Sequence, residues 1–224
     1  MNLDPPELAG VIFDLDGTLA DTIPVAFDAF RAALAPFVHR RYSDEELRSF
    51  FGPSEDGILR RIVPHDWAAC LERYLLEYET RHDACPAPFP GIPLVLDLLR
   101  DQEVPVGLVT GKVSRAVTIS LQRLGIADRF DVIEPGSPDG DVKAVALERI
   151  VKAWRIDGVR VAYVGDTPSD MIAAANAGLL PVGAAWDSRA DGRALRLAGA
   201  RVVFDSVDAL AGWLRDNLRT HLTA

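Results

Sequence analysis

The stretch Val11–Leu19, which reads VIFDLDGTL, decides how the rest of the chain can be interpreted. Its first three residues are apolar, and an unbroken apolar run is typical of a strand that is buried on both faces of a sheet. Asp14 and Asp16 follow where the predicted strand 10–13 ends, and no lysine or arginine precedes Arg31 to neutralise them. Ligands bind at the carboxyl ends of the strands in open parallel sheets. We therefore expect a cation, a shared proton or solvent beside these two carboxylates.

The composition limits the classes of function. The chain has 224 residues, 49% of them apolar, which is enough for one large domain or for a domain with a second one inserted. A formal net charge of −9 argues against nucleic acid or an anionic membrane surface as the main partner. Residues 1–9 lack the basic and apolar regions of a signal peptide, and no apolar run reaches the roughly 18–20 residues that span a bilayer. Cys70 and Cys85 form no C-x-x-C motif, so we expect a cytoplasmic protein with reduced thiols.

Two patterns of hydrophobic spacing divide the chain. From residue 21 to about 88 apolar residues recur at helical spacing, and Ser43–Glu46 has the form of a capping box that begins a helix. After a proline-rich linker, apolar strand segments alternate with amphipathic helices. This alternation predicts an α/β fold with a Rossmann-like, mostly parallel sheet covered by helices on both faces. We predict an α/β core domain, residues 1–20 and 89–224, and an all-helical cap domain, residues 21–88, inserted after the first strand.

Polar groups follow three of the predicted strands or begin the helix before one of them. These groups are Asp14 and Asp16, Thr110 and Gly111, Lys143, and Asp166 and Asp170. In a parallel sheet they would converge on one edge. Several carboxylates at one place favour a hard divalent cation, and Mg²⁺ is held by one or two carboxylates together with substrate phosphate. A lysine and a hydroxyl beside them suit the remaining phosphate oxygens.

Each motif has a plainer interpretation when it is taken alone. Asp-x-Asp-Gly is also typical of a strand that exits into a turn. An EF-hand calcium loop needs glycine at its sixth position, whereas Gly17 stands at the fourth. Residues 110–112 resemble the end of a phosphate-binding P-loop, but Val106 and Val113 stand where that motif needs glycine and a serine or threonine. The P-loop and the calcium loop are therefore rejected.

The motifs in combination and in order resemble the haloacid dehalogenase superfamily. The resemblance rests on VIFDLDGTL at 11–19, Thr110, Lys143 and VGDTPSD at 164–170, and it spans nearly the whole chain. The members that look most similar are those like phosphoglycolate phosphatase, which have a small helical cap. The resemblance implies a Mg²⁺-dependent phosphatase whose partner is a small phosphorylated metabolite, and a chain that is a monomer or a homodimer.

The resemblance also implies a role for each polar group. Asp14 would be the nucleophile that forms an aspartyl phosphate, and Asp16 would give a proton to the leaving oxygen and take one from water. Asp14, the backbone carbonyl of Asp16, Asp166 and Asp170 would hold Mg²⁺, with Asp170 direct or through water. The substrate phosphate would be bound by Thr110, Gly111 and Lys143.

Three branches of the superfamily can be compared with the sequence. Dehalogenases lack the second aspartate of the first motif, which is present here as Asp16. Phosphonoacetaldehyde hydrolases use a cap lysine, and residues 21–90 contain none. Sugar-phosphate mutases usually carry a histidine in the segment that enters the cap, and residues 23–27 contain none, which lowers but does not eliminate that reading. Hydrolysis of a small phosphomonoester is favoured, with a mutase, a pyrophosphatase or a non-catalytic module that binds a phosphorylated ligand as alternatives.

The turn at residues 51–55 resembles the substrate-specificity loop of this type of cap. The candidate specificity residues are Gly52, Pro53, Ser54, Arg48 and Arg60. A second anionic group on the substrate, such as a carboxylate, would suit these arginines. The alternative is that the arginines form a solvated helix face.

Overall fold

The computed structural model describes residues 7–218, and six of its strands form one sheet. The order across the sheet is β3-β2-β1-β4-β5-β6, and every neighbouring pair is parallel. The strands are β1 (Gly10–Phe13), β2 (Val106–Val109), β3 (Val132–Glu134), β4 (Val161–Gly165), β5 (Leu180–Ala184) and β6 (Val202–Phe204). The predicted α/β fold is confirmed, and the sheet is parallel throughout rather than mostly so.

The first strand lies in the middle of the sheet, between β2 and β4. Phe13 is in register with Leu108 on one side and with Val164 on the other. All residues of β1, β2 and β4 are buried, as the unbroken apolar run of β1 predicts. The strand β2 begins at Val106, directly after Pro105, which has no N–H to donate to a neighbouring strand.

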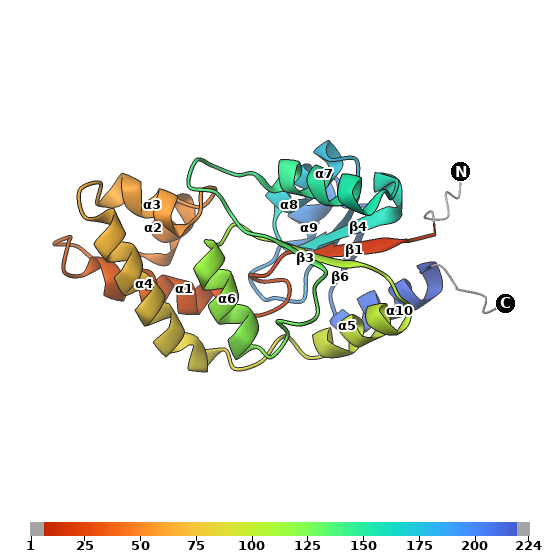
Figure 1. Cartoon of the computed structure of the whole chain (residues 1–224), viewed down its shortest axis with the longest axis horizontal. Coiled ribbons are helices and arrows are strands. Elements are labelled where there is room, and N and C mark those ends of the chain that lie inside the picture. Colours follow the sequence, from red (N-terminus) through yellow and green to blue (C-terminus); the bar gives the residue numbers. More distant parts are fainter. Residues whose placement is uncertain (1–6, 219–224) are drawn as a thin grey trace.

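Helices cover both faces of the sheet (Figure 1). One face packs against α7 (Lys143–Trp154) and α8 (Pro168–Asn176) through a cluster that includes Ile12 and Tyr163. The other face, to which Val11 and Phe13 belong, packs against α5 (Ile92–Asp101), α6 (Ser114–Arg123) and α10 (Val207–Asn217). The short helix α9 (Gly192–Leu197) contacts β5 and β6. Alternate residues of β1 thus face opposite layers, as expected for a central strand.

A helical insertion separates β1 from β2. It contains α1 (Ile23–Leu34), α2 (Asp44–Ser49), α3 (Glu55–Ile62), α4 (Trp67–Arg81) and a short 3₁₀ turn (His82–Ala84), and α5 then leads back to the sheet. Figure 1 places α1 to α4 together beyond one end of the sheet. The predicted insertion is confirmed, whereas the division at residues 20 and 88 stays a prediction.

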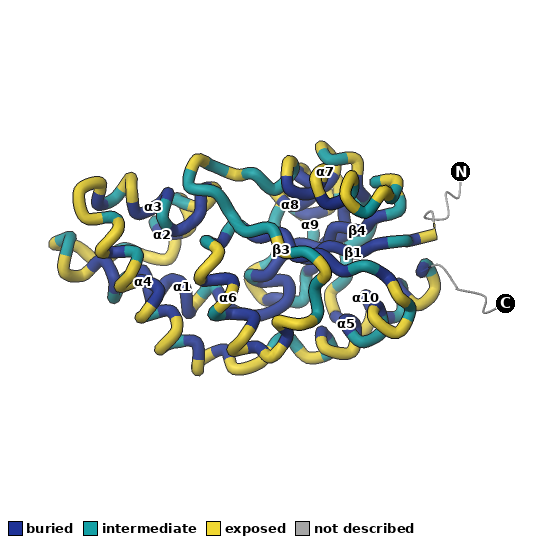
Figure 2. Tube along the Cα trace, in the orientation of Figure 1, coloured by how far each residue is buried: buried dark blue, intermediate teal, exposed yellow. Residues whose placement is uncertain are grey.

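The insertion shares its apolar interior with the core. Phe30 of α1 packs on Tyr74 of α4 with 4.5 Å between the ring centroids, and both belong to the same buried cluster as Phe13 of β1. Figure 2 shows buried segments running from the sheet into α1 and α4.

The predicted capping box at the start of α2 is present, since Ser43 Oγ accepts from the Glu46 amide and the Glu46 carboxylate accepts from the Ser43 amide. In the region from residue 7 to residue 218, no helix combines the length and the apolarity needed to cross a membrane.

Candidate active site

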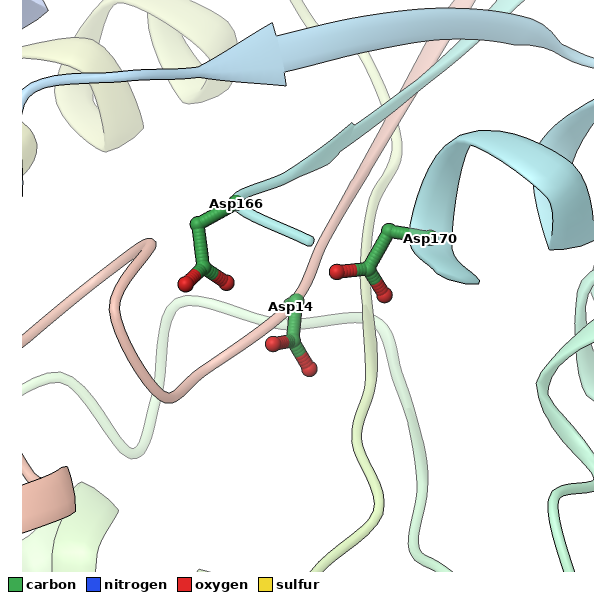
Figure 3. Close-up of side chains that lie close together, drawn as sticks. All are labelled: Asp14, Asp166 and Asp170. Atoms are coloured by element: carbon green, nitrogen blue, oxygen red, sulfur yellow. The ribbon is translucent and has the colours of Figure 1, made fainter. Parts of the chain in front are cut away.

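Three carboxylates meet at the carboxyl edge of the sheet. Asp14 follows β1, Asp166 follows β4, and Asp170 lies in the first turn of α8. One carboxylate oxygen of each lies within 4.8 Å of the others (Figure 3). The spacing along the chain is large, but β1 and β4 are neighbours, so their ends coincide. This is the convergence that the strand-end residues predict.

Asp170 is fixed by the start of α8. Thr167 Oγ1 accepts a hydrogen bond from the Asp170 amide, and an Asp170 carboxylate oxygen lies 3.0 Å from the Thr167 amide that donates to it. The two residues thereby form a capping box. The hydroxyl of Tyr163 in β4 also donates to Asp170 Oδ1 over 3.1 Å. The side chain is therefore held in one orientation toward Asp14.

The three carboxylates lie close together and are largely buried, so their charged forms need positive charge nearby. Burial raises the pKa of Asp14 to about 7, and the nearby carboxylates of Asp170 and Asp16 reinforce this shift against the opposing ammonium of Lys143. Burial, together with the charges of Asp170 and Asp14, raises the pKa of Asp166 well above its ordinary value. Burial alone would also raise the pKa of Asp170, but the Lys143 ammonium and the hydrogen bonds from Lys143 and Thr167 lower it.

Lys143 supplies one positive charge to this group. Its Nζ lies 3.0 Å from Asp14 Oδ1 and 2.6 Å from Asp170 Oδ1. Burial would lower the pKa of Lys143, but the charges of Asp14 and Asp170 raise it well above its ordinary value. One ammonium among three carboxylates leaves an excess of negative charge. The donor set of three carboxylates with excess negative charge fits a hard divalent cation.

The turn after β1 depends on Gly17. Its φ is +78°, which favours glycine, and an added Cβ would lie 2.3 Å from Asp166 Oδ2. The next residue, Thr18, donates from Oγ1 to Asp166 Oδ1 over 3.3 Å. The turn of the first motif is therefore packed directly against the carboxylate that follows β4.

Asp16 has different neighbours from Asp14. Its Oδ1 accepts a hydrogen bond from the Thr22 hydroxyl and lies 3.2 Å from Lys112 Nζ. The side chain of Asp16 does not belong to the group of three carboxylates found among residues 7–218. The two acids of the first motif thus occupy unequal environments, and the expected role of the Asp16 backbone carbonyl stays a prediction.

A cavity of about 550 Å³ opens between the sheet edge and the helical insertion. Its lining from the sheet side includes Asp14, Asp16, Gly111, Lys112, Lys143 and Asp166, and its lining from the insertion includes Arg48, Gly52, Pro53 and Glu55. A wider hollow of about 1000 Å³ lies around α1, residues 38–42 and the end of α4. It contains none of the predicted site residues, so the smaller cavity is the candidate active site.

Four of the predicted residues do not line this cavity. Thr110 is buried and accepts from the Lys112 amide over 3.3 Å, and Asp170 is buried behind Lys143. Ser54 is buried at the start of α3, and its hydroxyl donates to Asp56 rather than capping the helix. The Arg60 guanidinium stacks on the Trp67 ring at 4.4 Å, away from the cavity.

Several residues of the site had no clear signal in the sequence. Tyr163 reads as one more apolar residue of a buried strand, and Thr22 as one of the first residues of the predicted cap domain. Lys112 is one of only three lysines in the sequence, but its contact with Asp16 depends on the fold. Glu55 belongs to the turn at residues 51–55 that resembles a specificity loop, but an acid there is also ordinary in the first turn of a helix.

A family model described as haloacid dehalogenase-like hydrolase matches residues 11–184. The chain belongs to this family. The matched region runs from β1 to the end of β5 and includes every site residue predicted from the sequence. The resemblance inferred from the motifs is therefore confirmed at the level of the family, and the chain is an enzyme of a hydrolase class.

Curated relatives within the haloacid dehalogenase-like family are phosphatases. The chain is 28% identical to a phosphoglycolate phosphatase of Neisseria meningitidis serogroup A over 194 residues, which cover 82% of this chain and 83% of the relative. It is 26% identical to the pyrophosphatase PpaX of Bacillus pumilus over 187 residues, which cover 81% and 85%.

Solved structures share the fold of this chain. CbbY from Rhodobacter sphaeroides in complex with phosphate has a TM-score of 0.76 and 20% identity, covering 91% of this chain and 96% of that one. A hydrolase from Pseudomonas syringae has a TM-score of 0.75 and 22% identity, covering 94% and 100%. Such agreement over whole chains extends to the helical insertion.

Proposed function

We propose that this chain is a Mg²⁺-dependent phosphatase that hydrolyses a small, phosphoglycolate-like phosphomonoester through an aspartyl phosphate. The observation that carries the proposal is the meeting of Asp14 with Asp166 and Lys143 in the lining of a cavity of about 550 Å³, with Asp170 buried behind Lys143. The likeness to a phosphoglycolate phosphatase at 28% identity supports the choice of substrate class.

Asp14 is the proposed nucleophile. A carboxylate oxygen of Asp14 attacks phosphorus while the bond from phosphorus to the leaving oxygen breaks, and the phosphoryl group is transferred to Asp14. Asp16 gives its proton to the leaving oxygen. Water then attacks the aspartyl phosphate, Asp16 takes a proton from that water, and inorganic phosphate leaves. The unequal neighbours of Asp14 and Asp16 suit these two roles.

Lys143 is the proposed cation that binds the transferred phosphoryl group, together with Gly111 in the cavity wall and Thr110 beneath it. Asp14, Asp166 and Asp170 would hold Mg²⁺ with the backbone carbonyl of Asp16. When bound, Mg²⁺ shields the negative charge of the nucleophile and of the phosphate. The ammonium of Lys143 already contacts two of these carboxylates, so it lies where a phosphate oxygen would meet it.

Arg48 is the proposed contact for a second anionic group of the substrate. The other cations of the cavity are paired: Lys143 with Asp14 and Asp170, Lys112 with Asp16 and Glu55, and Arg189 with Asp21 and Asp187. Arg48 contacts the Phe27 ring at 5.6 Å and has no carboxylate partner in the part of the chain from residue 7 to 218. Gly52 and Pro53 complete this side of the cavity. Residues 21–88 would then form the cap that selects the substrate.

The test is phosphate release from a panel of phosphomonoesters, with and without Mg²⁺. The panel includes phosphoglycolate and several sugar phosphates, and Asp14→Asn is the control. We expect release that depends on Mg²⁺ and is abolished in Asp14→Asn. Unchanged activity in that variant would exclude Asp14 as the nucleophile. Binding of phosphomonoesters without any release would favour a non-catalytic module.

Pyrophosphate belongs in the same panel, because the similarity to PpaX favours pyrophosphatase as the second candidate function. A preference for pyrophosphate over every monoester would support this candidate and reject the phosphomonoester assignment. Conversion of one sugar phosphate into another without net phosphate release would point to a mutase.

A further inference from the structure

A buried ion pair joins the sheet domain to the helical insertion beside the proposed proton carrier. Lys112 lies in the turn after β2 and Glu55 is the first residue of α3, and each is 5% exposed. Lys112 Nζ lies 3.6 Å from Glu55 Oε1 and 3.2 Å from Asp16 Oδ1. One ammonium therefore contacts a carboxylate of the insertion and the carboxylate of Asp16.

Glu55 is held by donors from both parts of the molecule. Its Oε2 accepts from the amide of Val113 over 2.5 Å, and its Oε1 accepts from the Tyr74 hydroxyl of α4 over 3.1 Å. The Val113 amide stands at the start of α6, where backbone N–H groups have no partner within the helix. Glu55 thus supplies the partner that this end of α6 lacks.

The start of α3 rests closely on the sheet domain. The Ser54 amide donates to the Ser137 carbonyl over 2.8 Å. An added Cβ at Gly57 would lie 2.3 Å from the Pro138 carbonyl oxygen, so only glycine permits this approach. Glu55 reaches Lys112 and Val113 because the backbone on either side of it is docked on residues 137 and 138.

The ammonium of Lys112 also lies 4.6 Å from the centroid of the Tyr78 ring of α4. Its surroundings therefore come largely from the insertion, through Glu55 and Tyr78, although Lys112 itself belongs to the sheet domain. Asp16 has two polar neighbours among the described contacts, the Thr22 hydroxyl and this ammonium.

We propose that Glu55 and Lys112 are positioning residues for Asp16. The docked insertion brings Glu55 to Lys112, and Lys112 holds the Asp16 carboxylate in the orientation in which it transfers a proton to the leaving oxygen. The proposal rests on the proposed phosphatase function. Docking of the insertion is thereby linked to the orientation in which Asp16 transfers a proton.

The test compares two substrates in four variants. p-Nitrophenyl phosphate has a leaving group that departs without a proton, whereas phosphoglycolate has an alkyl leaving group that needs one. For phosphoglycolate we expect kcat/KM to fall about tenfold in Glu55→Gln and at least as far in Lys112→Met, with smaller losses for p-nitrophenyl phosphate. Lys112→Arg keeps the positive charge and should retain most of the activity. The double variant, which combines Glu55→Gln with Lys112→Met, should have a kcat/KM no lower than that of Lys112→Met alone, because Glu55 acts through Lys112.

The chain offers a matched control. Glu72 of α4 pairs with Arg115 of α6, so this pair also joins the insertion to the sheet domain, but both side chains are at least 60% exposed. Glu72→Gln should leave both substrates unaffected. Equal losses for the two substrates, or losses that multiply in the double variant, would overturn the positioning role.

A readout without turnover separates this proposal from the proposed function. Hydrogen exchange at the Val113 amide should be slow in the wild type, faster in Glu55→Ala and unchanged in Glu72→Gln. Circular dichroism establishes that each variant is folded. Unchanged exchange in Glu55→Ala overturns the docking contact, whereas a wild type that releases no phosphate from any substrate overturns the proposed function instead.

Discussion

The ammonium nitrogen of Lys143 lies 2.6 Å from Oδ1 of Asp170, so the start of α7 is tied to the first turn of α8. The same nitrogen lies 3.0 Å from Asp14 Oδ1. A buried carboxylate without a partner destabilises the folded protein, and here one ammonium pairs with two carboxylates. We therefore expect the stability of the site and the proposed binding of phosphate to depend on the same side chain.

Replacement of this cation should affect both properties. In Lys143→Met we expect the rate of phosphate release to fall by about 100-fold or more, because a charge that stabilises the transferred phosphoryl group is lost. The free energy of unfolding without metal should fall by about 3–5 kcal/mol, because two buried carboxylates lose their partner. Urea denaturation and a phosphate-release assay measure the two effects. Lys152→Met is the control, since Lys152 is exposed in the last turn of the same helix.

Asp14→Asn should change activity and stability in opposite directions. Activity should be lost with the proposed nucleophile, whereas one negative charge is removed from a crowded group of carboxylates. The pKa of Asp14 is raised from 3.8 to about 7, so the folded protein binds a proton that the unfolded chain releases, and stability falls as the pH rises across this interval. We expect the metal-free variant to be more stable than the wild type at pH 8, by about 1 kcal/mol or more, and not at pH 4. Denaturation in the presence of EDTA at the two pH values measures this difference, and a variant that is less stable at pH 8 would contradict it.

The binding of Mg²⁺ should depend on whether the carboxyls of Asp14 and Asp166 are protonated. Protons on Asp14 and Asp166 compete with a cation, because the pKa values of both carboxyls are raised. Added Mg²⁺ should therefore raise the thermal midpoint more at pH 8 than at pH 5. Titration calorimetry in two buffers of different ionisation enthalpy should show proton release on binding at pH 6. Asp166→Asn should weaken the effect strongly, and an equal increment at both pH values would rule out this linkage.

The sequence predicts the convergence of these residues well because strand ends are local features. Asp14 and Asp166 are 152 positions apart, yet each stands where an apolar run stops, and parallel strands bring such ends together. Lys143 could be placed by the same reasoning, since it begins the helix before β4. The only further premise is that the sheet is parallel, and the alternation of strands and helices indicates this.

Contacts between the insertion and the sheet domain could not be predicted in this way. Glu55 meets Lys112 because α3 docks on the turns that follow β2 and β3, and no periodicity encodes that rigid placement. Arg60, one turn further along α3, points instead to Trp67, so the helix phase decides which polar residue reaches the site. The contact of the Tyr163 hydroxyl could not be predicted for another reason. A tyrosine in the pattern of a buried strand looks like a packing residue until its neighbour Asp170 is known.

A final prediction concerns the pH dependence of stability at the interface of α4 and α6. His82 is fully buried, its Nε2 lies 3.3 Å from Ser120 Oγ, and its Nδ1 has no hydrogen-bond partner in the part of the chain that the structure describes. Burial, with the nearby charges of Lys112 and Arg123, lowers the pKa of His82 below 6.5. The unfolded chain therefore gains a proton at a higher pH than the folded protein does, and stability falls as the pH decreases below about 6.5.

His82→Gln removes this titration and retains a polar side chain that can meet Ser120. The free energy of unfolding should therefore fall less steeply between pH 7 and pH 5 in the variant than in the wild type, because a single titrating group has been deleted. Urea denaturation at several pH values measures the two slopes. His65→Gln, at an exposed position after α3, should keep the wild-type slope. Parallel curves for His82→Gln and the wild type would show that the imidazole binds a proton as readily in the folded state as in the unfolded chain, against the direction that its burial imposes.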